Sequence, residues 1–390
     1  MNSIFLFFYN KINFLLDYIY FLYLPKRTRS INPRTLLLVR LDAIGDYILF
    51  RNFIEAVFNS KKYRDYKITL CGNIEWKEIA EIHDKKFISQ FIWIDRNKFG
   101  LNPIYRFKIA NIIYRKGFEI AIESTYSREI HFGDFIIRAS YAFVRIGNSG
   151  EPLKIQRWKR KFISDKYYTN IVKLKQENLF EFKRNKEFFE AALDENLNIS
   201  RPNIDINLCS PFNIKNEFIT IFIGGRQKQK KWNFRKYADL LNMIIKNFKY
   251  YIIVLGSNKE SKLAGKIIDL ISEKSNISNL AGKTTLNQLI SIIYQSQLLI
   301  SNESMAVHLA AALNHKFVCI SNGNSWGRFL PYPNEIQNKG IYIIPNILKH
   351  TIEKKEINNE KLRYNSTINI NLIRPNEVYE AVSKSLNTDI

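Results

Sequence analysis

The sequence predicts an α/β fold in which two doubly wound, Rossmann-like domains follow one another along the chain. Short apolar runs alternate with amphipathic helical stretches from residue 35, and after a break near residue 200 the alternation starts again. Alternation of this kind builds a parallel sheet that helices cover on both faces. The 390 residues are too many for one ordinary core and suffice for two. Because open parallel sheets bind ligands beyond the carboxyl ends of their strands, we expect a ligand-binding cleft between two such domains.

The N-terminal domain is expected over residues 31–200. In its first helix Leu49, Phe53, Ala56 and Val57 share one face, as a helix packed on a sheet requires. Residues 150–200 are richer in charged and aromatic side chains, with basic residues through 154–166 and a helix near 177–193. The strands are predicted at residues 35–41, 67–71, 91–95, 118–123 and 143–146, and the helices at residues 46–58, 75–81, 103–115 and 132–141.

The C-terminal domain is expected over residues 217–372, after a linker at residues 201–216 that is rich in Pro and Asn. A last helix within residues 373–390 closes the chain. The strands of this domain are predicted at residues 218–223, 250–255, 277–280, 298–301 and 317–320, and its helices at residues 234–247, 259–271, 286–295 and 303–313.

An apolar segment precedes the first domain, within residues 1–30. Residues 4–24 approach the length of a membrane span, but Asn10, Asn13 and Asp17 interrupt them on one helical face. Pro25 and several basic residues follow, and the absence of a small-residue cleavage site argues against a signal peptide. We expect an amphipathic helix that lies on a membrane surface. A single membrane span and a helix packed on the protein's own surface remain alternatives.

The composition is strongly basic. There are 59 Lys and Arg residues against 36 Asp and Glu, a formal net charge of +23, and the sequence pI is about 9.7. Such a field attracts phosphates, acidic lipid or nucleic acid, but the basic residues form no run long enough to mark a nucleic-acid-binding arm. The three cysteines are far apart, and Cys71 and Cys319 end apolar runs, which indicates buried free thiols in a reducing compartment.

A Gly-Asp pair marks the turn between the first strand and the first helix. Gly45 permits a tight turn, and Asp46 follows it where a buried strand becomes a helix. A carboxylate is favoured at a helix start as a cap or through the helix dipole. The same position opens onto the expected cleft, where Asp46 could act as a catalytic base. The residues alone leave both interpretations open.

Glycines and basic residues follow the first strand of the second domain. Gly224 and Gly225 let backbone N–H groups approach a phosphate, and the K-Q-K-K-W run of residues 228–232, which contains Lys230, supplies the counter-charge. A tight turn followed by a solvated basic loop explains the same residues without a ligand.

A second candidate anion site lies at the helix start in S-N-E-S-M-A-V-H. Ser304 and His308 are four residues apart, on one face of a helix that begins near Glu303. The free N–H groups and the dipole of that helix suit a phosphate, and His308 can donate to the same anion. Alternatively, Asn302 caps the helix and His308 is a satisfied, half-buried imidazole.

Two further loops carry weaker signals. Glu260, in L-G-S-N-K-E, is placed to accept hydrogen bonds from ribose hydroxyls, although an acidic residue in a first helical turn is favoured in any case. In A-G-K-T-T-L, Thr285 is the predicted N-cap of the following helix, and Thr284 could lie beside a nucleobase.

Together these segments resemble glycosyltransferase family 9, the heptosyltransferases of lipopolysaccharide assembly. The resemblance runs from about residue 35 to residue 335. It rests on segments that occur in the family's order, namely L-L-L-V-R-L-D-A-I-G-D-Y-I-L, Gly224-Gly225 with Lys230-x-Trp232, L-G-x-x-x-E, L-A-G-K-T-T-L and N-E-S-x-x-x-H-L-A-A-A-L.

The resemblance implies a GT-B fold, with two Rossmann-like domains facing across a cleft. It also implies an inverting, metal-independent transfer of heptose or a related sugar from a nucleotide-diphosphate donor, most commonly an ADP-sugar, to lipopolysaccharide or another cell-surface glycan. No resident cofactor is implied. The matching residues are Asp46 as the general base; Gly224, Gly225, Lys230, Ser304 and His308 around the diphosphate; Glu303 at the diphosphate and sugar; Glu260 at the ribose; Thr284 near the base; and Arg128 at an acidic acceptor.

The sequence departs from the family pattern at three places. Glu303 stands where the family usually has Asp, Met305 where it usually has Gly, and the late loop reads S-N-G-N-S-W-G-R-F. These departures leave the donor sugar open. They also keep two alternatives, a sugar-nucleotide epimerase or hydrolase and a non-catalytic nucleotide-sugar-binding protein at a membrane. An enzyme of this family would act at the cytoplasmic face of the inner membrane, on a lipid-linked glycan acceptor, and no nucleic-acid partner is expected.

Overall fold

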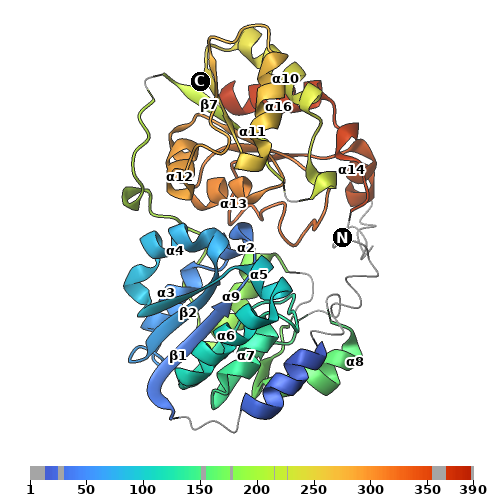
Figure 1. Ribbon diagram of the computed structural model, residues 1–390. Coiled ribbons are helices and arrows are strands. Elements are labelled where there is room, and N and C mark those ends of the chain that lie inside the picture. The colour runs from blue at the N-terminus through green and yellow to red at the C-terminus, as the bar shows by residue number, and fades with distance from the viewer. Residues whose placement is uncertain are drawn as a thin grey trace. The chain divides into compact units, whose positions relative to one another are not determined.

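Two parallel six-stranded sheets organise the computed structural model, which describes residues 14–24, 30–150, 155–175, 179–214, 216–225, 227–353 and 366–387. Each sheet belongs to one compact unit, and helices cover both faces of each sheet (Figure 1). Unit 1 comprises the described residues within Met1–Tyr47, Phe53–Glu177 and Arg184–Asn198, and unit 2 those within Ile48–Asn52, Asn178–Lys183 and Ile199–Ile390. The predicted α/β class with two Rossmann-like sheets is confirmed.

The first sheet has the strand order β3-β2-β1-β4-β5-β6. The strands are β1 (Asn32–Arg40), β2 (Lys67–Asn73), β3 (Gln90–Ile94), β4 (Phe118–Glu123), β5 (Val144–Asn148) and β6 (Asn170–Val172). The α-helices of this part of the chain are α2 (Ile44–Ile48), α3 (Asn52–Asn59), α4 (Lys77–His83), α5 (Arg96–Leu101), α6 (Pro103–Arg115), α7 (Gly133–Ser140), α8 (Arg157–Lys159) and α9 (Glu181–Leu193), with short turns η2 (Ile74–Trp76), η3 (Lys85–Phe87), η4 (Arg160–Ser164) and η5 (Asp165–Tyr167).

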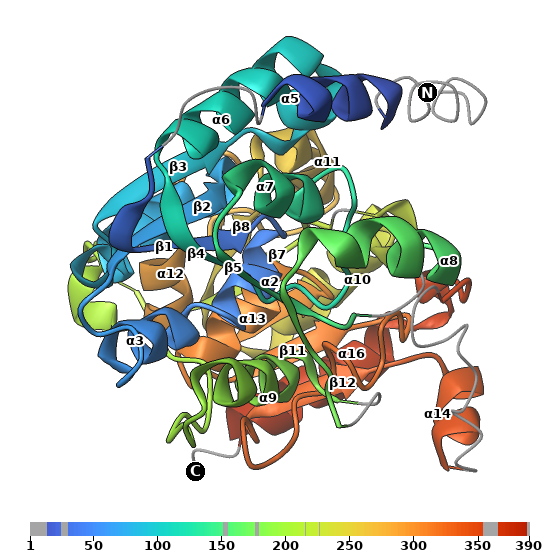
Figure 2. The same cartoon turned by 90° about the horizontal axis from the view of Figure 1, so that it is seen from below.

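The central strand β1 shows why the first sheet forms. Leu36, Leu37, Leu38 and Val39 are all fully buried, because a parallel strand in the middle of a sheet is covered on both faces. Leu37 and Val39 belong to the core that contains Ile109 of α6 and Ile136 of α7. Seen from below in Figure 2, α6 and α7 lie beside the β1–β4 part of the sheet. The apolar run that predicted this strand is therefore a core element.

The second sheet has the strand order β12-β11-β10-β7-β8-β9. Its strands are β7 (Phe218–Phe222), β8 (Tyr251–Leu255), β9 (Ile277–Asn279), β10 (Leu299–Asn302), β11 (Phe317–Ile320) and β12 (Gly340–Ile343). Its helices are α10 (Phe234–Asn247), α11 (Ser261–Asp269), α12 (Leu286–Gln295), α13 (Met305–Ala312), α14 (Asn346–Glu353) and α16 (Pro375–Asn387), with short turns η6 (Ile206–Leu208), η7 (Lys228–Lys230), η8 (Asn258–Glu260) and η9 (Ile370–Leu372).

Both sheets reverse their strand order at one place. In sequence order the strands of each sheet run 3-2-1-4-5-6, so the reversal falls between β1 and β4 in unit 1 and between β7 and β10 in unit 2. In open α/β sheets ligands bind beyond the carboxyl ends of the strands at this switch point. The loops after β1, β4, β7 and β10 are therefore the places where each unit can hold a ligand.

Most predicted elements are present, and the differences have local causes. Strand β11 and helices α6, α10 and α12 have the predicted bounds. The helix predicted over residues 46–58 is instead two helices, α2 and α3, separated by a turn at residues 49–51. Strands β6 and β12 and helix α5 were not predicted, because the edge strands are short and only partly buried and α5 is a six-residue helix.

The N-terminal helix, residues 14–24, packs on unit 1. Asp17 is buried and forms an ion pair with Arg106 of α6 at 2.9 Å, while Phe21 and Leu24 join the core. These residues therefore form a helix that packs on the protein's own surface, and the expected contact of its other face with a membrane stays a prediction. Among the described residues, no helix has the length and apolar character needed to cross a membrane. The predictions for Asn10, Asn13, the segment 25–29 and the last residues, 388–390, lie outside the described residues.

Candidate functional site

The loop after β7 and the loop after β10 meet at the switch point of unit 2. Gly224 and Gly225 follow β7, and the side-chain amide of Asn302, at the end of β10, donates to the Ile223 carbonyl at 3.3 Å. Gly224 leaves no room for a larger residue, because a Cβ there would lie 2.5 Å from the Phe222 ring. The structure therefore places the predicted glycines directly after β7, beside the end of β10, and their contact with a phosphate stays a prediction.

Lys230 and Glu303 form a largely buried ion pair at this site. The Lys230 ammonium contacts Glu303 Oε1, and the other carboxylate oxygen of Glu303 accepts a hydrogen bond from Ser321 Oγ at 2.8 Å. The side chains are 16% and 6% exposed. Buried charges of this kind require partners, so the longer side chain of Glu303 serves to hold the lysine. Sequence patterns did not single out Ser321, which belongs to the divergent late loop.

Ser304 is the N-cap of helix α13. Its hydroxyl accepts a hydrogen bond from the Ala306 N–H at 3.2 Å and lies 2.9 Å from Ser301 Oγ. The cap is therefore Ser304 rather than Asn302, whose side chain is used between the two loops, and the helix begins at Met305 instead of Glu303. The N–H groups of this first turn point out of the helix end, as an anion site requires.

His308 is one turn further along α13 and is neutral at physiological pH. Its Nδ1 lies 2.8 Å from the Tyr332 hydroxyl, and the residue is buried. Burial and the charge of Lys230 lower the pKa of His308 to about 3. An imidazole in this setting binds no proton near pH 7 and can offer only a neutral N–H, so donation from His308 to a diphosphate stays a prediction.

Glu260 has one partner in its own loop, Ser257, and one in the loop after β7, Lys231. It closes a capping box with Ser257, and its Oε1 pairs with Lys231 Nζ at 2.9 Å. Burial raises the pKa of the Glu260 carboxyl, but hydrogen bonds from Lys231 and Ser257 outweigh burial and hold the pKa below its ordinary value. Glu260 is therefore an ionised acceptor in the helical turn after β8, as expected of an acidic residue there, and its place at the ribose stays a prediction.

Thr284 and Thr285 follow β9. Thr285 is the N-cap of α12 and forms a capping box with Gln288, which confirms the predicted cap. Gly282, in the same turn, has a φ of +76°, and a Cβ there would lie 2.6 Å from the Asn258 backbone. Thr284 is half-buried between this turn and the cap, so its predicted place beside a nucleobase stays a prediction.

In unit 1 the switch point lies between β1 and β4. Asp46 is the third residue of α2, inside the first helical turn, and is half-buried. Arg40, at the end of β1, joins the two loops: its Nε lies 2.9 Å from the Asp42 carboxylate and its Nη1 3.1 Å from Ser124 Oγ, after β4. Arg40 is fully buried and was not predicted, although a charged residue ending an apolar strand is the signal that could have found it.

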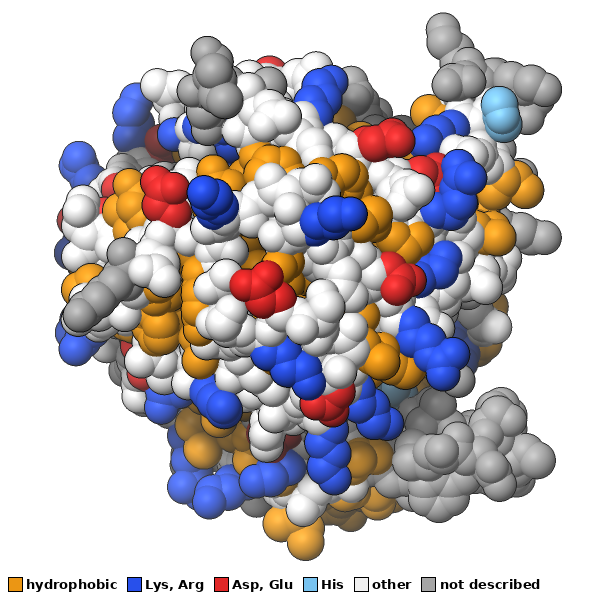
Figure 3. Space-filling view, turned by 90° about the horizontal axis from the view of Figure 1, so that it is seen from above, with side chains coloured by type: hydrophobic (Ala, Val, Ile, Leu, Met, Phe, Trp, Pro, Cys, Tyr) orange, Lys and Arg blue, Asp and Glu red, His pale blue; other side chains and the backbone are white. Residues whose placement is uncertain are grey.

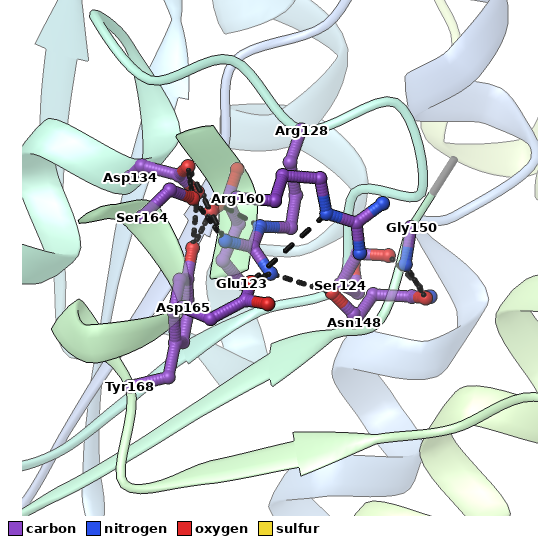
Figure 4. A network of polar contacts seen from close by, with 10 residues as sticks. All are labelled: Glu123, Ser124, Arg128, Asp134, Asn148, Gly150, Arg160, Ser164, Asp165 and Tyr168. Atoms are coloured by element: carbon purple, nitrogen blue, oxygen red, sulfur yellow. Dashed lines mark hydrogen bonds and ion pairs between the residues drawn. The ribbon is translucent and has the colours of Figure 1, made fainter. Parts of the chain in front are cut away.

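Arg128 lies in a buried network after β4 (Figure 4). Its guanidinium donates to Asp134 at 3.0 Å, to the Asn148 carbonyl at 3.0 Å and to Asp165 at 2.9 Å, and it also contacts Ser164. The residue is 2% exposed. An acceptor contact through Arg128 stays a prediction, and it requires this network to open.

The same network includes one further acidic group, Glu123, and one phenolic group, Tyr168. The Tyr168 hydroxyl contacts Glu123 and lies 2.6 Å from Asp134 Oδ1 (Figure 4). Burial, and then the nearby Asp134 charge, raise the pKa of Glu123 well above its ordinary value. Arg160 is half-buried beside the network, with its Nε 4.0 Å from Asp165. Arg160 is the more accessible guanidinium of this cluster, and sequence patterns did not distinguish it within the basic stretch.

Solved structures of known proteins show the fold class to which this chain belongs. Each sheet has the Rossmann strand order, and solved glycosyltransferase structures of GT-B type superimpose on the chain. The family 9 glycosyltransferase of Veillonella parvula covers 92% of this chain and 98% of its own, with a TM-score of 0.66 and 16% identity. The ADP-heptose lipopolysaccharide heptosyltransferase II of E. coli covers 91% and 99%, with a TM-score of 0.60 and 16% identity.

A match to a family model identifies the family of this chain. Glycosyltransferase family 9 (heptosyltransferase) matches residues 135–359, which is more than half of the chain, so the chain belongs to this family. Lipopolysaccharide heptosyltransferase 2 of Salmonella typhimurium is 29% identical over 123 residues, 30% of this chain. Lipooligosaccharide heptosyltransferase 2 of Campylobacter jejuni is 26% identical over 196 residues, 45% of this chain. The matched region spans 35% of the Salmonella protein and 60% of the Campylobacter protein.

Proposed function

We propose that the protein is an inverting, metal-independent glycosyltransferase. It moves heptose or a related sugar from a nucleotide-diphosphate donor, most commonly an ADP-sugar in this family, to lipopolysaccharide or another cell-surface glycan. The observation that carries the proposal is the group of residues at the β7–β10 switch point, which lies in the part of the chain that the family model matches. The donor is a substrate, and the proposal includes no resident cofactor.

The donor diphosphate is proposed to bind at this switch point. The N–H groups of Gly224 and Gly225 and the first turn of α13 offer hydrogen bonds, and Lys230 offers charge. In the free protein Lys230 contacts Glu303 and so keeps its position without a ligand. An ammonium has three N–H donors, so the donor phosphate can share Lys230 with Glu303. The Glu303 carboxylate also repels any phosphate that approaches Lys230 from the side that Glu303 occupies.

His308 is proposed to act as a neutral hydrogen-bond donor. Burial raises the pKa of the Tyr332 hydroxyl well above 10, so this group keeps its proton and can donate it to His308 Nδ1. The proton of the neutral ring then sits on Nε2, where it can reach a phosphate or sugar oxygen. Glu260 at the ribose and Thr284 beside the base complete the proposed donor site.

The acceptor hydroxyl is proposed to attack the anomeric carbon in a single displacement. Asp46 takes the hydroxyl proton as the general base, a role that typically contributes about 10²- to 10⁴-fold to the rate. The glycan is proposed to be lipid-linked, with its acidic groups near Arg128 and Arg160, so the enzyme works at the cytoplasmic face of the inner membrane. Met305, at the first position of α13, borders the donor-sugar side in place of the family's usual glycine.

The test separates binding from transfer. Asp46→Asn is expected to bind ADP-sugars as the wild type does and to lose transfer by about 10²-fold or more, measured as sugar incorporation into an isolated glycolipid. Lys230→Met is expected to lose donor binding in a thermal-shift assay, because ligand binding raises stability by mass action. Asp65→Asn and Lys262→Met, both at exposed positions, are the matched controls.

Each outcome bears on a different part of the proposal. Full transfer by Asp46→Asn refutes the base. Wild-type protein that converts or hydrolyses the donor without an acceptor supports an epimerase or hydrolase instead. Nucleotide-sugar binding without any turnover supports a non-catalytic role, and the absence of binding to ADP-, GDP-, UDP- and CMP-sugars contradicts the proposed function as a whole.

A further inference from the structure

The N-terminal helix (residues 14–24) exposes an apolar face. Leu15, Tyr18, Ile19, Leu22 and Tyr23 recur at the spacing of one helical face and are 42–62% exposed. The opposite face contains Asp17, Phe21 and Leu24, which are buried on unit 1. The amphipathic pattern of this helix is therefore turned so that the polar residue lies inward and the apolar residues outward.

Buried contacts fix the helix in this orientation. Asp17 lies 2.9 Å from Arg106 and 3.2 Å from His131 Nδ1, and the Asp17 and Arg106 side chains are 9% and 2% exposed. Tyr20 stacks on Phe107 with ring centroids 4.4 Å apart. Rolling the helix to bury its outer face would expose this ion pair and break the stacking. The outward apolar face is thus a stable feature of unit 1.

A second segment, residues 157–166, carries exposed aromatic and basic side chains. Trp158 and Phe162 are 55% and 57% exposed, and the ammonium groups of Lys159 and Lys161 lie 5.4 Å and 5.7 Å from their ring centroids. Arg157 and Lys166 are exposed as well. The acidic residue of this segment, Asp165, is paired with Arg128 at 2.9 Å. The segment therefore presents apolar rings with an excess of positive charge.

The two segments border one cavity. A space of about 350 Å³ is lined by Phe14, Tyr18 and Phe21 from the N-terminal helix and by Phe162, Ile163 and Lys166 from the second segment. Phe162 and Ile163 belong to η4, which follows α8 in the chain. The exposed apolar face and the basic aromatic segment thus border the same cavity, and we call the two together the docking surface.

We propose that the docking surface binds an anionic phospholipid bilayer. Leu15, Ile19 and Leu22 enter the interfacial region, Tyr18 and Trp158 lie at the headgroup level, and the basic residues of 157–166 meet lipid phosphates. Aromatic and aliphatic side chains flanked by Lys and Arg are the composition that lies in a membrane interface. The inference takes the membrane location from the proposed function and assigns it to named residues.

A second copy of the chain fits this surface less well. Each chain carries a net charge of +23, so two copies repel one another, whereas an anionic bilayer attracts the surface. Charge therefore favours a lipid surface.

Vesicle co-sedimentation of the full chain tests the inference. Wild-type protein is expected to sediment with phosphatidylcholine vesicles that contain phosphatidylglycerol and to bind pure phosphatidylcholine at least about tenfold more weakly. The variants Ile19→Ser with Leu22→Ser, and Trp158→Ala with Phe162→Ala, are each expected to weaken binding by about tenfold or more. Leu270→Ser with Leu372→Ser removes two exposed leucines of unit 2, 48% and 58% exposed, and is the matched control.

ADP-sugar binding and circular dichroism, measured on the same samples, show that the variants fold. Equal vesicle binding by the docking-surface variants and the control overturns the inference. The inference is also overturned if the wild-type protein does not bind vesicles but forms dimers, and the docking-surface variants do not form these dimers. Lost vesicle binding with intact ADP-sugar binding supports the inference, whereas vesicle binding without any nucleotide-sugar binding contradicts the proposed function alone.

Discussion

At the residue scale, the charge state of the site depends on burial more than on residue type. His308 is held neutral beside Tyr332, while the Lys230 ammonium is kept in a largely buried position by Glu303. Glu123, in the other unit, is shifted in the opposite direction, because burial and Asp134 raise its pKa. For the proposed diphosphate site, a lysine would supply charge at one point and a neutral histidine a hydrogen bond at another.

The lowered pKa of His308 predicts that the free energy of unfolding depends on pH. The folded pKa of about 3 lies below the ordinary value of 6.5, so the unfolded chain binds more protons between these two pH values. The free energy of unfolding therefore falls as the pH drops below 6.5, by roughly 1.4 kcal/mol per pH unit for one such group. Urea unfolding at pH 7 and pH 5 should show a loss about 2 kcal/mol larger for the wild type than for His308→Asn.

A second histidine serves as a comparison. Burial, with Lys339 and Lys316 nearby, lowers the pKa of His315 to about 4, so His315→Asn should reduce the same slope. An identical pH slope in the wild type and His308→Asn would show that His308 is not held neutral.

At the element scale, the helix starts of unit 2 combine capping with the proposed binding role. Ser304 caps α13, Glu260 closes the capping box at η8, and Thr285 caps α12 directly after Thr284. Each of these turns follows a parallel strand, where the chain must satisfy free N–H groups with a nearby side-chain oxygen. The same requirement places polar residues beyond the strand ends, where the nucleotide is proposed to bind.

Substitutions at the adjacent residues Thr284 and Thr285 separate the capping role from the proposed binding role. Thr285→Ala removes the cap of α12 and is expected to lower the free energy of unfolding by about 1 kcal/mol, with ADP-sugar affinity unchanged. Thr284→Ala is expected to leave stability within about 0.5 kcal/mol and to weaken ADP-sugar binding. Urea unfolding and isothermal titration on both variants provide the measurements. Weakened binding in Thr285→Ala alone would contradict the assignment of Thr284.

At the scale of the whole molecule, the two units are interleaved in sequence. Unit 2 includes described residues within Ile48–Asn52 and Asn178–Lys183 besides its main segment. Glu181 accepts from Arg328 Nε at 2.8 Å, and the two side chains are 1% and 8% exposed. Asn52 accepts from the Asn203 N–H at 2.9 Å. The predicted boundary near residue 200 therefore divides the main segments but not the complete units.

A fragment of residues 199–390 should be less stable than unit 2 in the full chain. Without Glu181 the buried Arg328 has lost its counter-ion, which typically costs about 3–5 kcal/mol. Urea unfolding of the fragment and of the full chain measures the difference. Arg328→Met is the matched variant: it should destabilise the full chain, which keeps Glu181, and stabilise the fragment. A fragment as stable as the full chain would contradict this reasoning.

The net charge also acts on the whole molecule. On the face shown in Figure 3, Lys and Arg side chains are spread among acidic, apolar and neutral ones. A charge of +23 distributed in this way produces a broad positive field that raises the local concentration of anions. This general attraction suits a sugar diphosphate and an acidic lipid surface alike.

The sequence by itself determined the two sheets and the loops that carry the site. Apolar runs of strand length separated by amphipathic helices leave few arrangements other than parallel sheets, and parallel sheets place Gly224, Glu303 and Asp46 after strands. Local signals also sufficed for the Thr285 cap and for Cys71 and Cys319, which are buried free thiols. These features depend on neighbours only a few residues away, which a sequence shows directly.

The tertiary structure alone decided which distant groups meet. Lys230 reaches Glu303 across 73 positions of sequence, and Asp17 reaches Arg106 across 89. Periodicity placed Asp17 on one helical face but could not say that this face turns inward, because the energy of a buried carboxylate depends on whether a partner is present. Burial likewise neutralised His308 and enclosed Arg128. Charge states and partners therefore came from packing, whereas the order of strands, helices and loops came from the sequence.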